Sequence, residues 1–102
     1  MNPFIGCHAL VTRQDASNWP AGGWFPAERM TREEALWAMT LWPAYASFCE
    51  DVLGSLTPGK YADFIVVSQD VMSVAPERIL DTQVLMTVLG GRVVYQKEGW
   101  QP

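Results

Sequence analysis

The chain has 102 residues, a net charge of −4 at neutral pH and 49% hydrophobic residues. This length allows one domain at most. The acidic balance argues against a nucleic-acid or anionic-membrane partner, since either would need a basic surface.

The sequence has no apolar run close to the roughly eighteen residues of a membrane span. Its first residues include neither the basic nor the apolar segment of a signal peptide, so we expect none. Two cysteines, Cys7 and Cys49, are too few for a disulfide framework. We therefore expect free thiols in a reducing compartment and a cytoplasmic protein.

Five tryptophans are spread along this short chain: Trp19, Trp24, Trp37, Trp42 and Trp100. A small domain has a limited interior. Either these rings fill one dense core, or some lie on a face that another polypeptide covers. Exposed apolar patches usually mark interfaces, so we favour the second interpretation for part of the set.

The first expected element is a helix over residues 3–13. Asn2 suits the N-cap, and Pro3 fits the first helical position, where its missing N–H is no loss. Gly6 weakens the helix by about 1 kcal/mol relative to alanine. One helical face carries Phe4, Cys7, His8 and Val11.

Residues 14–29 form a long loop that is rich in Gly, Pro, Asp and Asn. Loops of this length tend to be either functional or disordered. Trp19, Trp24 and Phe25 favour an ordered loop. Two interpretations are open: the aromatic rings anchor a surface loop by packing against the protein, or the loop faces a substrate.

The clearest helix start is Thr31, with Glu34 as its capping-box partner. The segment that follows, to residue 41, is apolar almost all round, which predicts burial on several sides. Pro43 disfavours helical geometry at Trp42. A second short helix is expected over residues 44–49.

Residues 54–67 combine a turn with a strand. Pro58 and Gly59 suit the two central positions of a type II turn, and Gly54 begins the turn segment. Asp63 then precedes the apolar strand, for which two interpretations are open. The carboxylate either caps this turn by accepting local backbone N–H bonds or acts as a catalytic acid or base.

The remaining chain is rich in strand-forming residues. A helical turn is expected over residues 76–80, and two apolar runs flank Gly90-Gly91, which is a hairpin signal. Three strands, over 63–67, 83–89 and 92–96, would pair as a small mixed sheet. Helices followed by strands predict an α+β fold.

Little in the chain supports catalysis by itself. His8 is the only histidine, and on a helix it points about 100° away from Cys7, so the two cannot face one ion. We therefore expect no metal site and no cofactor within this chain. A small thiol or metal enzyme centred on Cys7 and His8 is a further hypothesis, which fast alkylation of Cys7 would support.

Five segments, in order, resemble the C-terminal part of the metal-dependent amidohydrolases. Residues 54–67, G-S-L-T-P-G-K-Y-A-D-F-I-V-V, are similar to the strand by which that family re-enters its β-sandwich. M-T-R-E-E-A-L-W-A-M-T resembles the last barrel helix, P-A-Y-A-S-F the small helix after it, and V-L-M-T-V-L-G-G-R-V-V-Y the closing hairpin. N-P-F-I-G-C-H-A-L-V-T-R resembles the YtcJ-like branch, amidohydrolase family 3.

The resemblance implies a hydrolase that attacks C–N bonds of the amide type with a metal-activated water, zinc being one such metal. It implies two parts in this chain: 1–53, a helical segment like the end of a TIM-like barrel, and 54–102, a segment of the composite β-sandwich. The family's metal ligands precede the position of Asn2 and have no counterpart here. Asn2, His8 and Arg13 would lie nearest the active site. The structural motif would comprise Gly54, Pro58, Gly59, Asp63, Gly90 and Gly91.

Two kinds of partner follow. As a portion of a hydrolase, the chain would be non-catalytic alone and would pack against the missing barrel. As a free-standing interaction module, it would form a homo-oligomer, for example by exchange of its N-terminal helices.

Overall fold

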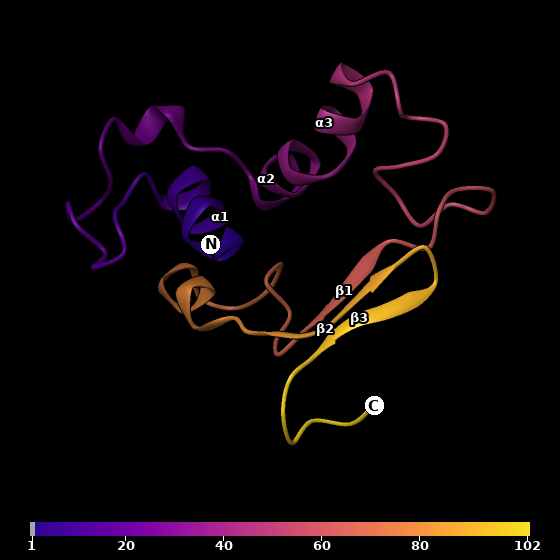
Figure 1. Cartoon of the computed structure of the whole chain (residues 1–102). Coiled ribbons are helices and arrows are strands. Elements are labelled where there is room, and N and C mark those ends of the chain that lie inside the picture. The colour runs from indigo at the N-terminus through magenta and orange to yellow at the C-terminus, as the bar shows by residue number, and fades with distance from the viewer. Residues whose placement is uncertain (1) are drawn as a thin grey trace. The chain divides into compact units, whose positions relative to one another are not determined.

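The computed structural model describes residues 2–102, which form an α+β fold (Figure 1). Its helices are α1 (Pro3–Thr12), α2 (Arg32–Met39) and α3 (Leu41–Ala46), with 3₁₀ helices η1 (Pro26–Glu28) and η2 (Pro76–Asp81). Its strands are β1 (Phe64–Val67), β2 (Val84–Leu89) and β3 (Arg92–Gln96). No helix within residues 2–102 is long and apolar enough to cross a membrane.

The chain divides into two compact units, and each is built from two separate segments. The helical unit comprises the chain up to Met39 together with Asp70–Thr82. The sheet unit comprises Thr40–Gln69 and Gln83–Pro102. The resemblance implies a different division, into residues 1–53 and 54–102. That division stays a prediction.

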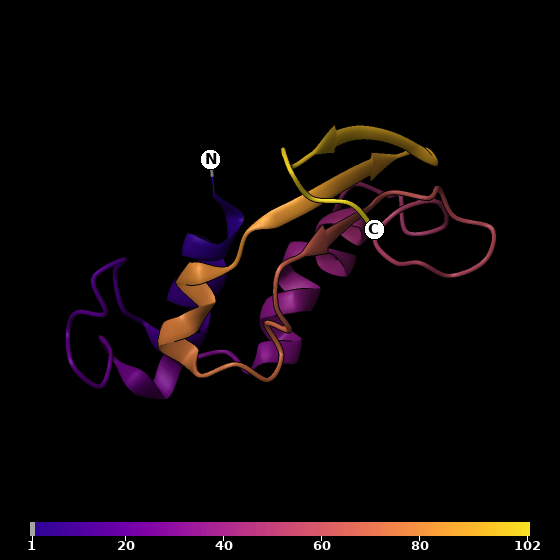
Figure 2. The ribbon, with the colours of Figure 1, turned by 90° about the horizontal axis from the view of Figure 1, so that it is seen from below.

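In the helical unit, α1 begins and ends with the caps that its sequence indicates. The Asn2 side chain accepts a hydrogen bond from the Phe4 N–H at 2.9 Å, and Pro3 occupies the first turn. Arg13 closes the helix in left-handed geometry, with its N–H bonded to the Ala9 carbonyl. The helix packs along η2, as Figure 2 shows, and also against α2. The small core of this unit includes Phe4, Cys7, His8, Ala35 and Ile79.

The capping box of α2 is confirmed. Thr31 N donates to the Glu34 carboxylate at 3.0 Å, and Glu34 N donates to the Thr31 hydroxyl at 3.1 Å. The bond from the Thr31 backbone N–H is the main cause that lowers the pKa of Glu34, because it stabilises the charged carboxylate. The expected burial of α2 on several sides is wrong for this chain, since only Ala35 is buried and Leu36 and Trp37 stay substantially exposed. Residues 2–102 offer α2 too little apolar surface to cover the rest.

In the sheet unit, α3 starts earlier than expected. It spans Leu41–Ala46 rather than 44–49, and Trp42 is helical although it precedes Pro43. Pro43 falls in the first turn, where no N–H is needed for the helical hydrogen bonds.

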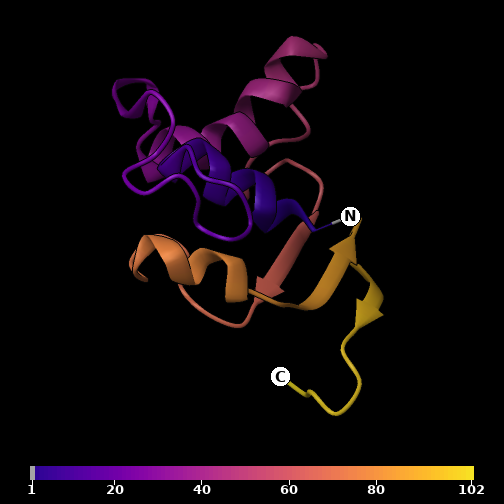
Figure 3. The same cartoon turned by 90° about the vertical axis from the view of Figure 1, so that its left-hand side faces the viewer.

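The three strands are confirmed to within one residue, in the order β1-β2-β3 with β2 in the middle (Figure 1). Both pairings are antiparallel, so the expected mixed sheet is wrong. The segment that contains η2 brings the chain back beside the end of β1, where Ser68 N donates to the Gln83 carbonyl at 2.9 Å. After β3, Lys97 N still donates to the Leu85 carbonyl of β2 at 2.8 Å, and the chain then continues to its end outside the strands (Figure 3).

The β2–β3 hairpin turns on Gly90 and Gly91, as expected. Their φ angles are 59° and 79°, which is the left-handed geometry that a two-residue primed turn requires at both positions. The sheet pairs Phe64 with Val88 and Ile65 with Thr87. Of all its strand residues only Val88 is fully buried, so the sheet is largely uncovered in this chain.

Candidate functional site

The three residues that the resemblance places nearest an active site all belong to α1 or its caps. Asn2 caps the helix start and Arg13 the helix end, as described above. His8 lies between them, in the core of the helical unit. Each side chain therefore has a structural role in this unit, and their predicted proximity to an active site stays a prediction.

His8 is fully buried, and within the described part of the chain only one of its two ring nitrogens has a hydrogen-bond partner. Its Nε2 lies 2.8 Å from the Asn18 Oδ1, so Nε2–H donates to the loop. Its Nδ1 is buried and has no hydrogen-bond partner among residues 2–102. A buried polar atom left without a partner costs roughly 1–3 kcal/mol. His8 therefore ties the 14–29 loop to α1 but is an imperfect core residue in the chain as described.

Arg13 holds the far end of the same loop. Its Nε donates to the Trp24 carbonyl at 2.8 Å, and Trp24 N donates to the Arg13 carbonyl at 2.9 Å. Near the loop start, the Asp15 carboxylate accepts bonds from the Ser17 N–H and hydroxyl. These bonds from Ser17 lower the pKa of Asp15. The loop is thus ordered by polar contacts.

The aromatic rings of this loop do not pin it. Trp19, Trp24 and Phe25 are all mostly exposed, and Trp24 and Phe25 meet edge to face with their centroids 4.9 Å apart. The interpretation in which aromatic side chains anchor the loop is wrong for this chain, because hydrogen bonds do so. A substrate-facing loop stays a prediction.

The 54–67 stretch forms the turn that its sequence predicts. Lys60 N donates to the Thr57 carbonyl at 3.2 Å, and Gly59 has φ 96°, as the third position of a type II turn requires. Gly54 also has a positive φ, of 95°, and lies against α3, where an added Cβ would come within 2.9 Å of the Ala44 Cβ. Gly59 is therefore needed for its backbone geometry, and Gly54 for both geometry and space.

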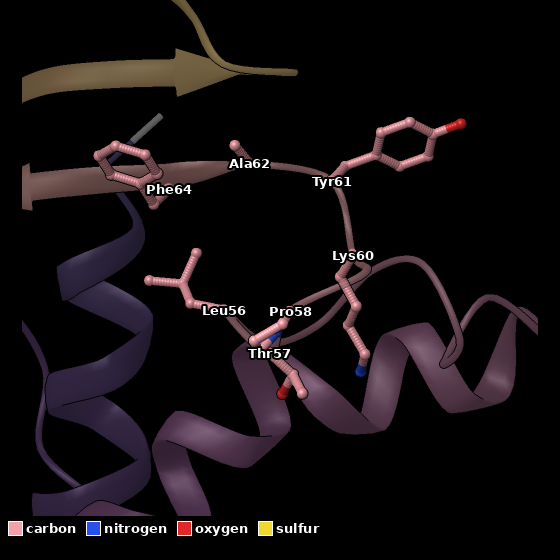
Figure 4. Close-up of a pocket in the computed structure, with 7 residues that line it drawn as sticks. All are labelled: Leu56, Thr57, Pro58, Lys60, Tyr61, Ala62 and Phe64. Atoms are coloured by element: carbon pink, nitrogen blue, oxygen red, sulfur yellow. The ribbon is translucent and has the colours of Figure 1, made fainter.

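This turn borders an open pocket of about 320 Å³ in the sheet unit (Figure 4). Leu56 and Phe64 approach each other across it, whereas Tyr61 points away (Figure 4). The Lys60 ammonium is already bonded to the Leu53 carbonyl at 3.2 Å. The residues that line it are Leu56, Thr57, Pro58, Lys60, Tyr61, Ala62 and Phe64. An apolar, open pocket without an acid–base pair offers no catalytic machinery.

Asp63 links the start of β1 to the β2–β3 hairpin. Its Oδ1 accepts a hydrogen bond from Gly90 N at 2.7 Å, and Gly91 N donates to the neighbouring Ala62 carbonyl at 2.9 Å. The expected capping role, accepting a backbone N–H, is observed, but the expected turn, the one just before Asp63, is wrong. The turn that it caps is the distant β2–β3 hairpin, which the sequence did not indicate.

Replacing Asp63 with alanine is expected to destabilise the sheet unit by about 1–2 kcal/mol, because Gly90 N would lose an acceptor that is a charged carboxylate. Chemical unfolding followed by circular dichroism measures this loss. Asp63→Asn is the matched control, since its amide oxygen can still accept the bond, and it should lose less. Equal losses for the two variants would contradict a hydrogen-bonding role.

Burial makes Cys7 a poor nucleophile. Desolvation raises the pKa of the Cys7 thiol above its ordinary value of 9.0, and Arg32 only partly offsets this effect. Cys49 is less buried, and both thiols are free. At neutral pH a raised pKa leaves less of the reactive thiolate.

We therefore expect iodoacetamide to modify Cys7 more slowly than Cys49 at neutral pH, with the Cys7 rate still rising with pH beyond 9.0. Mass spectrometry of peptides after timed labelling measures both rates in one sample. Faster labelling of Cys7 than of a free cysteine peptide would instead support the thiol-enzyme hypothesis.

No group of three His, Cys, Asp or Glu side chains is placed to hold a metal ion within residues 2–102. The divalent metal that the resemblance implies does not fit the residues present. A catalytic zinc site normally needs three protein ligands. His8 is buried, and its Nε2 is hydrogen-bonded to Asn18.

Three known proteins have sequences similar to this chain. The chain is 39% identical over 72 residues to Protein LONG AFTER FAR-RED 3 of Arabidopsis thaliana, covering 71% of this chain and 12% of that protein. It is 35% identical over 74 residues to the N-substituted formamide deformylase of Arthrobacter pascens, covering 72% of this chain and 14% of the relative. An amidohydrolase candidate of Bacillus subtilis (strain 168), YtcJ, is 26% identical over 97 residues, which cover 95% of this chain and 18% of that protein.

The matched part of this chain therefore spans less than a fifth of the length of each of these relatives. No solved structure matches it significantly. The model of the amidohydrolase family matches residues 1–95, which is nearly the whole chain. Because this match covers far more than half of its length, the chain belongs to the amidohydrolase family.

Proposed function

We propose that this chain forms the C-terminal portion of a metal-dependent, amidohydrolase-type hydrolase and is non-catalytic by itself. The observation that carries this proposal is the mismatch between the family and the residues present. The family match extends over residues 1–95, yet residues 2–102 provide no group of side chains suited to a metal ion. The ligands and the activated water would come from the rest of the hydrolase.

The exposed apolar surface of α2 supports this proposal. Leu36, Trp37 and Met39 all remain substantially exposed. Soluble monomers rarely expose contiguous apolar patches of this kind, and such patches mark surfaces that another structure covers. In the proposed hydrolase, α2 is the last barrel helix, and its apolar sides pack against its neighbours in the barrel.

The sheet would be one layer of the composite β-sandwich. Val93, Val94 and Tyr95 follow one another along β3 and are all about half exposed, so apolar side chains point to both faces of this strand. A strand that is apolar on both faces is typical of a sheet covered on both sides. We place this protein in the cytoplasm, because its two thiols are free.

By the same proposal, α1 follows the eighth barrel strand, and Asn2, His8 and Arg13 lie closest to the reacting bond. We assign them no catalytic role, since each already caps or anchors the helical unit. The substrate class is a C–N bond of the amide type. The name of the Arthrobacter relative describes such a reaction, the deformylation of N-substituted formamides, for that protein.

Metal analysis of the purified chain, combined with an amide-hydrolysis assay, tests the proposal. We expect no stoichiometric zinc and no turnover, with or without added Zn²⁺. An N-substituted formamide is a suitable first substrate, and the intact Arthrobacter enzyme is the positive control. Tightly bound stoichiometric zinc together with turnover by this chain would overturn the proposal.

The alternative is a free-standing interaction module. It is favoured by the same exposed side chains, because a chain that acts alone must cover them by association. Activity measurements of this chain do not separate these two functions, because both predict an inactive chain.

A further inference from the structure

The two outer strands of the sheet are built differently. On β3, Thr87 pairs with Tyr95 and Val88 with Val93, so Val94 is an extra, bulged residue in the middle of the strand. β3 also begins with the charged Arg92. Bulges and charges are the features that keep edge strands from pairing with other chains.

β1 has neither protection. Its four residues, Phe-Ile-Val-Val, include no charge and no proline. It pairs with β2 residue for residue from Phe64 to Val66, and the extra residue of the later register shift, Leu85, lies on β2. A regular, uncharged edge strand is a template for a further strand.

The outer side of β1 is also open. Among the described residues, the backbone groups of Phe64–Val67 bond to β2 and to no other segment. Alternate N–H and C=O groups therefore point outward without an intramolecular partner. Phe64 and Ile65 are 37% and 46% exposed, so neither face of this strand is fully covered.

We propose that β1 is a self-association edge, which pairs antiparallel with β1 of a second copy of this chain. A twofold axis requires a residue to lie opposite itself, because paired residues in an antiparallel ladder point the same way. With Ile65 on the axis, it lies opposite Ile65 of the partner subunit. Phe64 then lies opposite Val66 of the partner subunit, so the three central residues form apolar pairs, and only Val67 meets a polar residue, Asp63 of the partner subunit, just outside its strand.

This register also continues the existing rows of side chains. On one face the Phe64–Val88 row gains the partner subunit's Val66. An aromatic side chain beside a β-branched one is a favourable cross-strand pair. On the other face the Ile65–Thr87 row gains the partner subunit's Ile65. The two sheets join into one continuous sheet, and no like charges meet within the paired strands.

The strand sequence favours a second copy of this chain as the partner at this edge, because β1 paired antiparallel with itself brings apolar side chains together. The proposal does not rest on the proposed function and concerns this chain as it stands. Exchange of the N-terminal helices would give a different dimer, in which the β1 edges stay free. A strand from another polypeptide at this edge would leave the chain monomeric when pure.

Sedimentation velocity over a wide range of concentrations tests the proposal on the full chain. We expect a reversible monomer–dimer equilibrium. Ile65→Lys should raise the dimer Kd at least about tenfold, because two ammonium groups would then face each other across the axis. Val94→Lys is the matched control, because Val94 is 56% exposed on the opposite edge, and its Kd should not change.

A cross-linking variant covers the case in which the lysine variant does not fold, which circular dichroism would reveal. Ile65→Cys should give a covalent dimer on mild oxidation, with a disulfide between the two introduced cysteines identified by mass spectrometry. Val94→Cys should not. A wild-type chain that is monomeric at every concentration overturns the proposal, as does a dimer that neither position-65 variant affects.

Discussion

Replacing Ile79 with alanine is expected to lower the free energy of unfolding by about 2–5 kcal/mol. Ile79 lies in η2, is fully buried, and belongs to the segment that packs along α1. Truncation removes buried methyl groups and leaves a cavity that rigid neighbours fill only in part. Because small domains are stable by only about 5–15 kcal/mol, this single change should remove a large share of the total.

Ile5→Ala is the matched control. It is the same substitution on α1, but Ile5 is 47% exposed, and surface changes usually stay within about 0.5 kcal/mol. Urea unfolding followed by circular dichroism measures both variants. Similar losses would mean that η2 does not form part of the core, and the two-segment helical unit would then be wrong.

Features that depend on neighbouring residues were predictable from the sequence. The Asn2 cap, the Thr31–Glu34 capping box and the Gly90-Gly91 turn are all confirmed. Each is decided within a few residues, by a side chain that reaches a nearby N–H or by glycines that adopt positive φ. The strands were located for the same reason, because apolar runs between turn residues are local signals.

Features that depend on distant pairing were not predictable. Asp63 caps a turn 27 residues further along the chain, and its own neighbours indicate only that it caps something. The strand directions depend on how the η2 segment returns to the sheet, which no strand sequence encodes. The helical unit includes η2, which is separated from the rest of that unit by 30 residues of the sheet unit, so the order of the sequence was a poor guide to its core.

Burial was the least predictable property. The apolar pattern of α2 indicated a helix enclosed on several sides, and the structure leaves Leu36 and Trp37 exposed. A sequence records which side chains favour burial, but not whether the covering surface belongs to the same chain. At the candidate site the sequence placed His8 on the inner helix face, whereas its partner, Asn18, depends on the conformation of a long loop.

That loop conformation depends strongly on Gly23. It has φ 88°, and an added Cβ would lie 2.3 Å from the Thr12 carbonyl oxygen, which is a backbone atom at the end of α1. Alanine at this position would need both left-handed geometry and a displaced backbone. Gly23 directly precedes Trp24, whose N–H bonds to the Arg13 carbonyl, so such a displacement would break the contact between the loop and the helix.

Gly23→Ala is therefore expected to destabilise the helical unit by about 2–4 kcal/mol, as the sum of the left-handed backbone and the steric overlap. The adjacent Gly22→Ala separates these two causes. Gly22 also has a positive φ, of 77°, but an added Cβ there meets no atom within 4 Å, so only the backbone cost of about 1–2 kcal/mol applies. Thermal or urea unfolding of both variants measures the difference. If Gly22→Ala is as damaging as Gly23→Ala, close packing of the loop on α1 is wrong, and only the φ angles of the two glycines matter.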